Sequence, residues 1–124
     1  MQIFLKMTSK DPLYIQIKEE IKKKIITKEL SAESQLPSVR VLSKELKVGV
    51  VTIKRAYDEL VNEGFIISKE AIGYFVLEIS DDWIKKIGKE IIKEDILNVK
   101  EKAKMYKLSN SDIELLLKEE LENE

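Results

Sequence analysis

Side chains able to perform catalysis are scarce in this sequence of 124 residues. It contains no cysteine and no histidine, which removes thiol nucleophiles, imidazole bases and nearly every zinc or haem site. Carboxylates remain, but the acid pairs Glu19-Glu20 and Glu119-Glu120 are sequence neighbours on solvated helix faces, not facing acid and base groups. The sequence has no glycine-rich phosphate loop. We therefore predict no enzymatic activity, no catalytic or metal-binding residue and no cofactor.

Composition and charge set further bounds. Apolar residues make up 44% of the chain and charged residues 36%, which suits about one folded domain. No apolar run approaches the roughly 18 residues that cross a membrane, and the N-terminus lacks a secretory signal pattern. Without cysteines, the chain is expected in the cytoplasm, with no membrane contact. The net charge is −1, so overall charge does not predict a nucleic-acid partner.

The first helix is predicted from Pro12 to about Glu29. Asp11 suits the N-cap, and Pro12 suits the first helical position because its missing N–H costs no hydrogen bond there. An apolar stripe follows at helical spacing: Tyr14, Ile17, Ile21 and Ile25. The lysines lie mostly off this stripe and are expected to face solvent: Lys18, Lys22, Lys23 and Lys24. Residues 2–6 are expected to form a short edge strand or a packed tail.

Two more helices and a hairpin are predicted after a loop at residues 30–36. Ser38 is placed to cap a short helix, and residues 47–49 form a tight turn. A third helix is expected from Val50 to Glu63, with Gly64 as a left-handed C-cap. Its apolar stripe consists of Ile53, Tyr57, Leu60 and Val61. The apolar runs 65–67 and 74–77 predict a β-hairpin.

This order of elements predicts a mostly α fold with a small β-hairpin (α+β). The second and third helices form a helix-turn-helix, and the hairpin forms a wing. A helix fits the DNA major groove, and a wing adds a contact to phosphates or the minor groove. We expect a winged helix-turn-helix DNA-binding domain at residues 11–79.

Residues 80–124 are predicted to form a tail of two helices. Asp81 and Asp82 favour the start of a long helix that runs from Asp82 to Tyr106, and a last helix begins near Ser109 or Ser111. The long helix carries an apolar stripe that the preceding domain is too small to cover: Ile84, Ile87, Ile91, Ile96, Val99, Ala103 and Tyr106. We expect this stripe to pair with a second copy across a two-fold axis, with Trp83 as an anchor.

Three motifs in residues 11–79 resemble the winged-helix domain of the GntR family of bacterial transcription regulators, and most of all its short YtrA-type subfamily. They are the run Leu36 to Arg40, the run Thr52 to Tyr57, and the junction Glu63 to Phe65. The opening Pro12-Leu13-Tyr14 followed by Gln16-Ile17 also matches. The tail matches the subfamily in length and pattern only, and short members of the subfamily dimerise through such tails.

The resemblance implies the residues that contact DNA. By position in the family pattern, or by their place at the turn and wing, they are Ser38, Arg40, Val50, Val51, Thr52, Lys54, Arg55 and Lys69. A structural role competes at several positions. Arg40 could instead pair with an acid such as Glu45, Thr52 could help cap its helix, and Arg55 could chiefly brace the fold.

The sequence also departs from the family pattern. Lys47 replaces a usual left-handed glycine, at a cost of roughly 1 kcal/mol if the turn keeps its shape. Val50 and Val51 can touch thymine methyl groups but cannot form bidentate hydrogen bonds with bases. At the wing tip, Glu70 and Ala71 replace a usual basic residue and a glycine.

We expect a homodimeric repressor that binds a two-half-site operator on double-stranded DNA, with more salt sensitivity than sequence discrimination. The alternative is a winged-helix protein-interaction module with weakened or lost DNA recognition, which the two valines, Glu70 and the acidic tail favour. No residue identifies a small-molecule effector.

Overall fold

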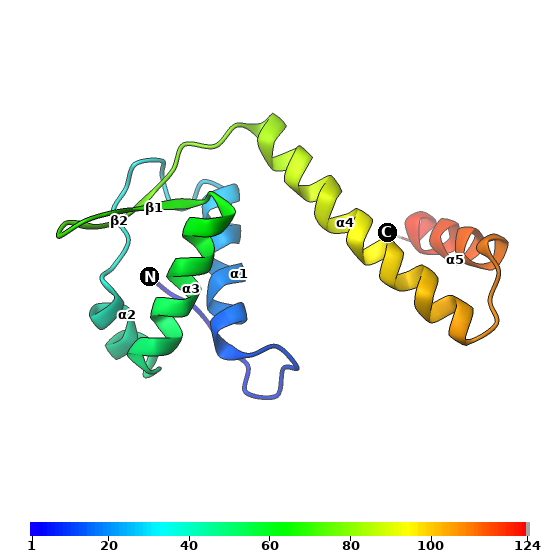
Figure 1. Ribbon diagram of the computed structural model, residues 1–124, viewed down its shortest axis with the longest axis horizontal. Helices are drawn as coiled ribbons and strands as arrows, with labels where there is room; N and C mark the ends of the chain where they lie inside the picture. Colours follow the sequence, from blue (N-terminus) through cyan, green and yellow to red (C-terminus); the bar gives the residue numbers. More distant parts are fainter. Residues whose placement is uncertain (124) are drawn as a thin grey trace. The chain divides into compact units, whose positions relative to one another are not determined.

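The computed structural model describes residues 1–123 and divides into two compact units, Met1–Ser80 and a second unit that begins at Asp81 (Figure 1). The first unit holds three helices and a two-stranded antiparallel sheet, and the second holds two helices. The prediction of a mostly helical fold with a small hairpin is confirmed. No helix within residues 1–123 combines the length and apolar character needed to cross a membrane.

Helix α1 spans Leu13–Ile26 and buries the predicted residues Ile17, Ile21 and Ile25. The prediction that Asp11 caps this helix is wrong, because Pro12 itself has an extended backbone and occupies the N-cap. The Pro12 carbonyl accepts hydrogen bonds from the N–H groups of residues 15 and 16 at 3.1 Å. The helix also ends before Glu29, since Lys28 takes a left-handed conformation with φ 64°.

The N-terminal segment is a packed tail, not a strand. Ile3 is buried, and residues 2–6 pair with no strand. The side chain of Gln16 holds the segment against α1: its Oε1 accepts from the Lys6 N–H at 2.8 Å, and its Nε2 donates to the Lys6 carbonyl at 3.0 Å.

Helices α2 (Val39–Leu46) and α3 (Val50–Glu63) form the predicted helix-turn-helix. The Ser38 hydroxyl accepts a hydrogen bond from the Val41 N–H at 3.1 Å, which confirms Ser38 as the cap of α2. Lys47 ends α2 in the left-handed conformation, with φ 56° and ψ 44°. Gly64 ends α3 with φ 86°, as predicted.

Tyr57 of α3 ties together three parts of the first unit. Its side chain is fully buried, and its hydroxyl donates to the Pro37 carbonyl at 2.7 Å. Its ring meets the Tyr74 ring of the hairpin edge-on, with centroids 4.8 Å apart. Burial raises the pKa of the Tyr57 hydroxyl, which therefore remains a neutral donor. Helix α3 is thus fixed relative to both the segment that leads into α2 and the hairpin.

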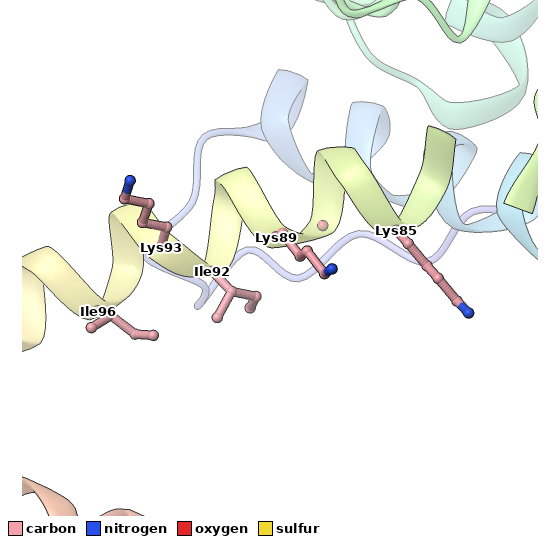
Figure 2. Close-up of a pocket in the computed structure, with 6 residues that line it drawn as sticks. Lys85, Lys89, Ile92, Lys93 and Ile96 are labelled. Carbon is pink, nitrogen blue, oxygen red and sulfur yellow. The ribbon is translucent and has the colours of Figure 1, made fainter. Parts of the chain in front are cut away.

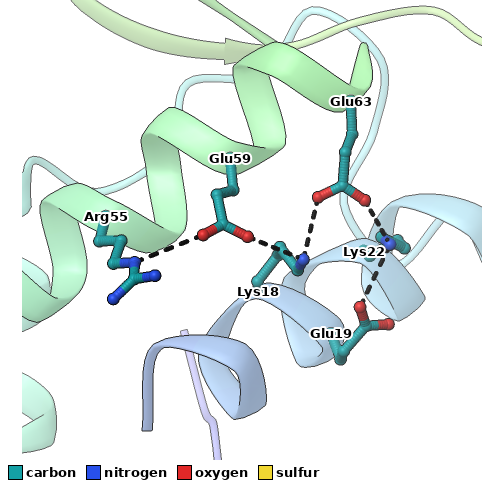
Figure 3. Close-up of polar contacts among 6 residues, drawn as sticks. All are labelled: Lys18, Glu19, Lys22, Arg55, Glu59 and Glu63. Carbon is teal, nitrogen blue, oxygen red and sulfur yellow. Dashed lines mark hydrogen bonds and ion pairs between the residues drawn. The ribbon is translucent and has the colours of Figure 1, made fainter. Parts of the chain in front are cut away.

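An ion-pair network links α1 to α3 (Figure 3). Lys18 Nζ lies 3.0 Å from carboxylate oxygens of both Glu59 and Glu63, and Lys22 Nζ lies 2.8 Å from Glu63. The side chains of Lys18 and Lys22 are only 14% and 9% exposed. The prediction that these two lysines face solvent is wrong, because α3 supplies acids that cover them.

The hairpin consists of β1 (Ile66–Lys69) and β2 (Gly73–Val76), paired in register from Ile66 opposite Val76 to Lys69 opposite Gly73. The segment 30–36, predicted as a loop, lies beside the free edge of β2 and pairs with it at one position. Gln35 forms a β-bridge with Phe75, and the Leu36 N–H donates to the Tyr74 carbonyl at 2.9 Å. Strand β2 is therefore hydrogen-bonded on both sides, to β1 within the wing and to residues 35 and 36 outside it.

The second unit contains α4 (Asp81–Met105) and α5 (Asn110–Glu122), which pack on each other. Ser109 and Asp112 form a capping box at the start of α5. The Ser109 N–H donates to Asp112, and this backbone hydrogen bond lowers the pKa of the Asp112 carboxyl. Ala103 is the one residue of α4 that is buried.

Candidate nucleic-acid interface

The outer side of α3 carries an apolar pair followed by a cation. Val51 is 82% exposed and Val50 is 45% exposed, both in the first turn. Lys54 lies one turn further along, and its Nζ is 2.6 Å from Oδ1 of Asp58. This hydrogen bond outweighs a small effect of burial and raises the pKa of Lys54, so the lysine is charged at neutral pH. Sequence reasoning missed Asp58, although its four-residue spacing from Lys54 was a usable signal.

Arg40 and Ser38 lie at the exposed N-terminal end of α2. Within residues 1–123 Arg40 forms no ion pair, and Glu45, its suggested partner, lies 3.6 Å from the Met1 amine instead. The Ser38 oxygen accepts the cap hydrogen bond, which leaves its O–H able to donate to a phosphate oxygen.

Arg55 and Thr52 hold more structural positions. The Arg55 guanidinium stacks on the Tyr14 ring at 3.7 Å from its centroid, and its Nε lies 3.5 Å from Glu59. Thr52 is half-buried in the first turn of α3. Arg55 thus braces α3 against α1, and its side chain is still 60% exposed.

The wing tip combines one cation with an acid and an apolar residue. Lys69 Nζ lies 4.5 Å from the centroid of the Phe75 ring, which positions the ammonium beside β2. Glu70, Ala71 and Ile72 are exposed, and Ala71 has a left-handed φ of 62°. The wing therefore offers a single positive charge next to a carboxylate.

The predicted dimerisation residues of α4 differ in exposure. Trp83, Ile84 and Ile87 are half-buried, whereas a second group is exposed: Ile91, Ile96, Val99 and Tyr106. Ala103 is buried inside its own chain, where it lines an apolar cavity of about 420 Å³ between α4 and α5. Sequence reasoning omitted three further exposed apolar residues of α4, Ile92, Leu97 and Met105.

The part of the chain that the structure describes contains no group of three or more acidic side chains able to hold a metal ion. The chemistry available on the helix-turn-helix is instead that of hydroxyl donors, apolar side chains and five exposed cations: Arg40, Lys44, Lys47, Lys54 and Arg55.

The second helix of a helix-turn-helix is the recognition helix that enters the DNA major groove, and here it is α3. An exposed recognition helix beside a braced wing is the arrangement found in DNA-binding transcriptional regulators. Residues 13–76 match the family described as "Bacterial regulatory proteins, gntR family", and the chain belongs to that family. Its likeness to the solved YtrA structure places it with the YtrA-like subfamily. This assignment favours DNA binding over the alternative of a protein-interaction module.

Two similar sequences come from Bacillus subtilis (strain 168). The HTH-type transcriptional regulator YhcF is 32% identical over 96 residues, which cover 75% of this chain and 79% of YhcF. The regulator YhdI is 42% identical over 76 residues, which cover 61% of this chain but 16% of YhdI. The chain therefore spans most of one relative and a small part of the other.

Solved structures repeat the fold. YtrA from Sulfolobus acidocaldarius, a GntR-family transcription factor, has a TM-score of 0.64 and 34% identity over 77% of this chain and 97% of YtrA. A GntR-family regulator from Listeria monocytogenes has a TM-score of 0.67 and 27% identity over 91% and 98% of the two chains. The AraR DNA-binding domain in complex with operator ORE1 has a TM-score of 0.53 and 30% identity over 61% and 93%.

Proposed function

We propose that this protein is a sequence-specific repressor that binds, as a homodimer, an operator with two half-sites in cytoplasmic DNA. The observation that carries the proposal is the outer side of the helix-turn-helix, where Val51, Lys54 and Arg40 point to solvent. A repressor role is supported by the relative NagR from Bacillus subtilis (strain 168), named an HTH-type transcriptional repressor and 35% identical over 65 residues. Those residues cover 52% of this chain and 27% of NagR.

The proposed DNA contacts divide into two kinds. Arg40 and Lys54 bind phosphates or guanine edges, and Ser38 and Thr52 donate to phosphates. Val50 and Val51 contact thymine methyl groups, which favours A·T-rich sites. Lys69 adds a phosphate contact from the wing, and Arg55 contributes mainly by bracing α3.

The second unit is proposed to supply the dimer. In the functional division that we propose, residues 11–79 bind DNA and residues 80–124 dimerise. Support comes from the exposed apolar side chains of α4 and α5, which in water favour association. A two-fold dimer also presents two recognition helices to two half-sites.

Fluorescence anisotropy with duplex DNA from the protein's own upstream region tests the proposal at several salt concentrations. Arg40→Ala and Lys54→Ala should each weaken binding by about 1–3 kcal/mol, roughly five- to 150-fold in Kd. Loss of a phosphate contact should also reduce the steepness with which affinity falls as salt rises.

Lys23→Ala is the matched control, because Lys23 is exposed on α1 and lies outside the helix-turn-helix and wing. It should leave the Kd nearly unchanged. Failure of the wild-type protein to bind at low salt, or equal losses in all three variants, would contradict the proposed interface.

A further inference from the structure

Helix α4 carries apolar surface that its own chain does not cover. At ~1.5 Å per residue, the 25 residues of α4 extend roughly 37 Å, whereas the 13 residues of α5 extend roughly 20 Å. The apolar cavity between the two helices is lined on the α4 side from Ile96 onward. Helix α5 therefore packs on the second half of α4 and leaves the first half open.

The open half of α4 forms a shallow groove with mixed chemistry. Its lining residues are Lys85, Gly88, Lys89, Ile92, Lys93 and Ile96. Figure 2 shows that Lys85 and Lys89 project from the same side of the helix as Ile92 and Ile96, whereas Lys93 points away. The groove thus joins an apolar floor to a row of two cations.

Gly88 lies in this groove, and no contact inside its own chain explains why this position is a glycine. Glycine in a helix interior costs about 1 kcal/mol relative to alanine. A Cβ added at Gly88 would meet nothing within 4 Å, so packing inside the chain does not require the glycine. A missing side chain at this position allows a second helix to approach α4 closely.

The charge of α5 complements that of the groove. Residues 84–93 contain four lysines and one acid, whereas the sequence from Asp112 onward contains six acids and one lysine. Glu119 and Glu122 are exposed and lie three residues apart, so they share a side of α5. Leu115 is exposed on the same side of α5 as these two acids and can contact the apolar floor.

We propose that α5 of a second copy docks in the α4 groove, with Lys85 and Lys89 paired to Glu119 and Glu122 of the other copy. The inference rests on the proposed homodimer and specifies which surfaces meet. Because a two-fold dimer repeats each contact, the charge pairs form twice and fix the arrangement of the two chains.

Charge reversal in two separate variants tests this pairing by sedimentation velocity. One variant carries Lys85→Glu and Lys89→Glu, and the other carries Glu119→Lys and Glu122→Lys. Each alone places like charges at both contacts and should raise the dimer Kd about tenfold or more. Mixed one to one, the variants should form a heterodimer with a Kd within about threefold of the wild type, because both contacts are then attractive.

A control variant with Lys86→Glu and Lys107→Glu makes the same change in net charge at exposed residues outside the groove lining, and it should dimerise like the wild type. Recovery in the mixture also shows that the two variants fold. If the wild-type protein is a dimer but neither variant weakens it, or mixing restores nothing, the groove pairing is wrong while the homodimer stands. A monomeric wild-type protein at tens of micromolar would overturn both.

Discussion

At the scale of single residues, Asp58 controls the charge that α3 offers to DNA. Its carboxylate holds Lys54 at 2.6 Å, and both side chains are about half exposed. Binding a phosphate requires Lys54 to leave or share this pair, and the carboxylate repels the phosphate as well. Exposed pairs of this kind are worth about 0.2–1 kcal/mol.

We predict that Asp58→Asn strengthens DNA binding by about 1 kcal/mol, roughly fivefold in Kd, with the larger gain at low salt. Anisotropy titrations of the two proteins at matched salt measure the gain. Glu90→Gln is the control, since Glu90 is an exposed acid on α4 and should change the Kd little. Weaker binding by Asp58→Asn would mean that the pair positions Lys54 for DNA.

Lys47 lowers the stability of the fold through strain in its own backbone. A non-glycine residue in the left-handed region is disfavoured by roughly 1 kcal/mol, and Lys47 has φ 56° at the turn between α2 and α3. Lys47→Gly should therefore stabilise the fold by about 0.5–1 kcal/mol, the loss of chain entropy being smaller than the strain relieved. Urea denaturation followed by circular dichroism measures this, and Lys44→Gly inside α2 should instead destabilise by about 1 kcal/mol.

At the scale of elements, the ion-pair network between α1 and α3 stabilises the fold only in the pH range where its acids and lysines are both charged. Burial opposes ionisation of Glu63, but its hydrogen bonds to Lys22 and Lys18 prevail and hold its pKa below the usual 4.5. Burial likewise opposes the charge of Lys18, but hydrogen bonds to Glu59 and Glu63 raise its pKa above the usual 10.5. The stabilisation from Glu63 is therefore lost as pH falls below about 4.5, and that from Lys18 is lost as pH rises above about 10.5.

Glu63→Gln should cost about 1–2 kcal/mol of unfolding free energy at pH 7, after allowing for solvent screening of a partly exposed carboxylate. The difference from the wild type should shrink as the pH falls below 4.5, where the wild-type carboxyl also takes up a proton. Urea melts between pH 3 and 7 test this, with Glu78→Gln as an exposed control. A difference that stays constant down to pH 3 would show that Glu63 does not act through its charge.

The sequence predicted those elements whose signals are local. The cap at Ser38, the limits of α3 and the C-cap at Gly64 follow from neighbouring residues, and all were confirmed. The bridge between Gln35 and Phe75 joins residues 40 positions apart, and Lys18 meets Glu59 across 41 positions. Such partners depend on how helices pack, so a lysine beside the α1 stripe reads as solvated until α3 is placed against it. The same limit hid the stacking of Arg55 on Tyr14.

At the scale of the whole molecule, the proposed DNA-binding residues and the proposed dimerisation residues fall in different compact units. The helix-turn-helix and wing lie in Met1–Ser80, and the exposed apolar helices lie in the unit that begins at Asp81. With this division, substitutions on the outer side of α3 are expected to leave the proposed dimer unchanged. This is consistent with the likeness to the larger relative YhdI, which is confined to 76 residues.

A dimer of this kind should be sensitive to the helical phase of its operator. Two half-sites about one turn of DNA apart, roughly 10 base pairs, face the same side of the duplex. An insertion of five base pairs between them turns the second half-site by half a turn, and we predict that affinity falls about tenfold or more because one recognition helix loses its groove. An insertion of ten base pairs restores the phase and should recover part of that affinity. Anisotropy on an operator selected from random duplexes measures all three spacings. Equal affinity at every spacing would show that each half-site is bound independently, and hence that the pairing of the second units does not orient the first.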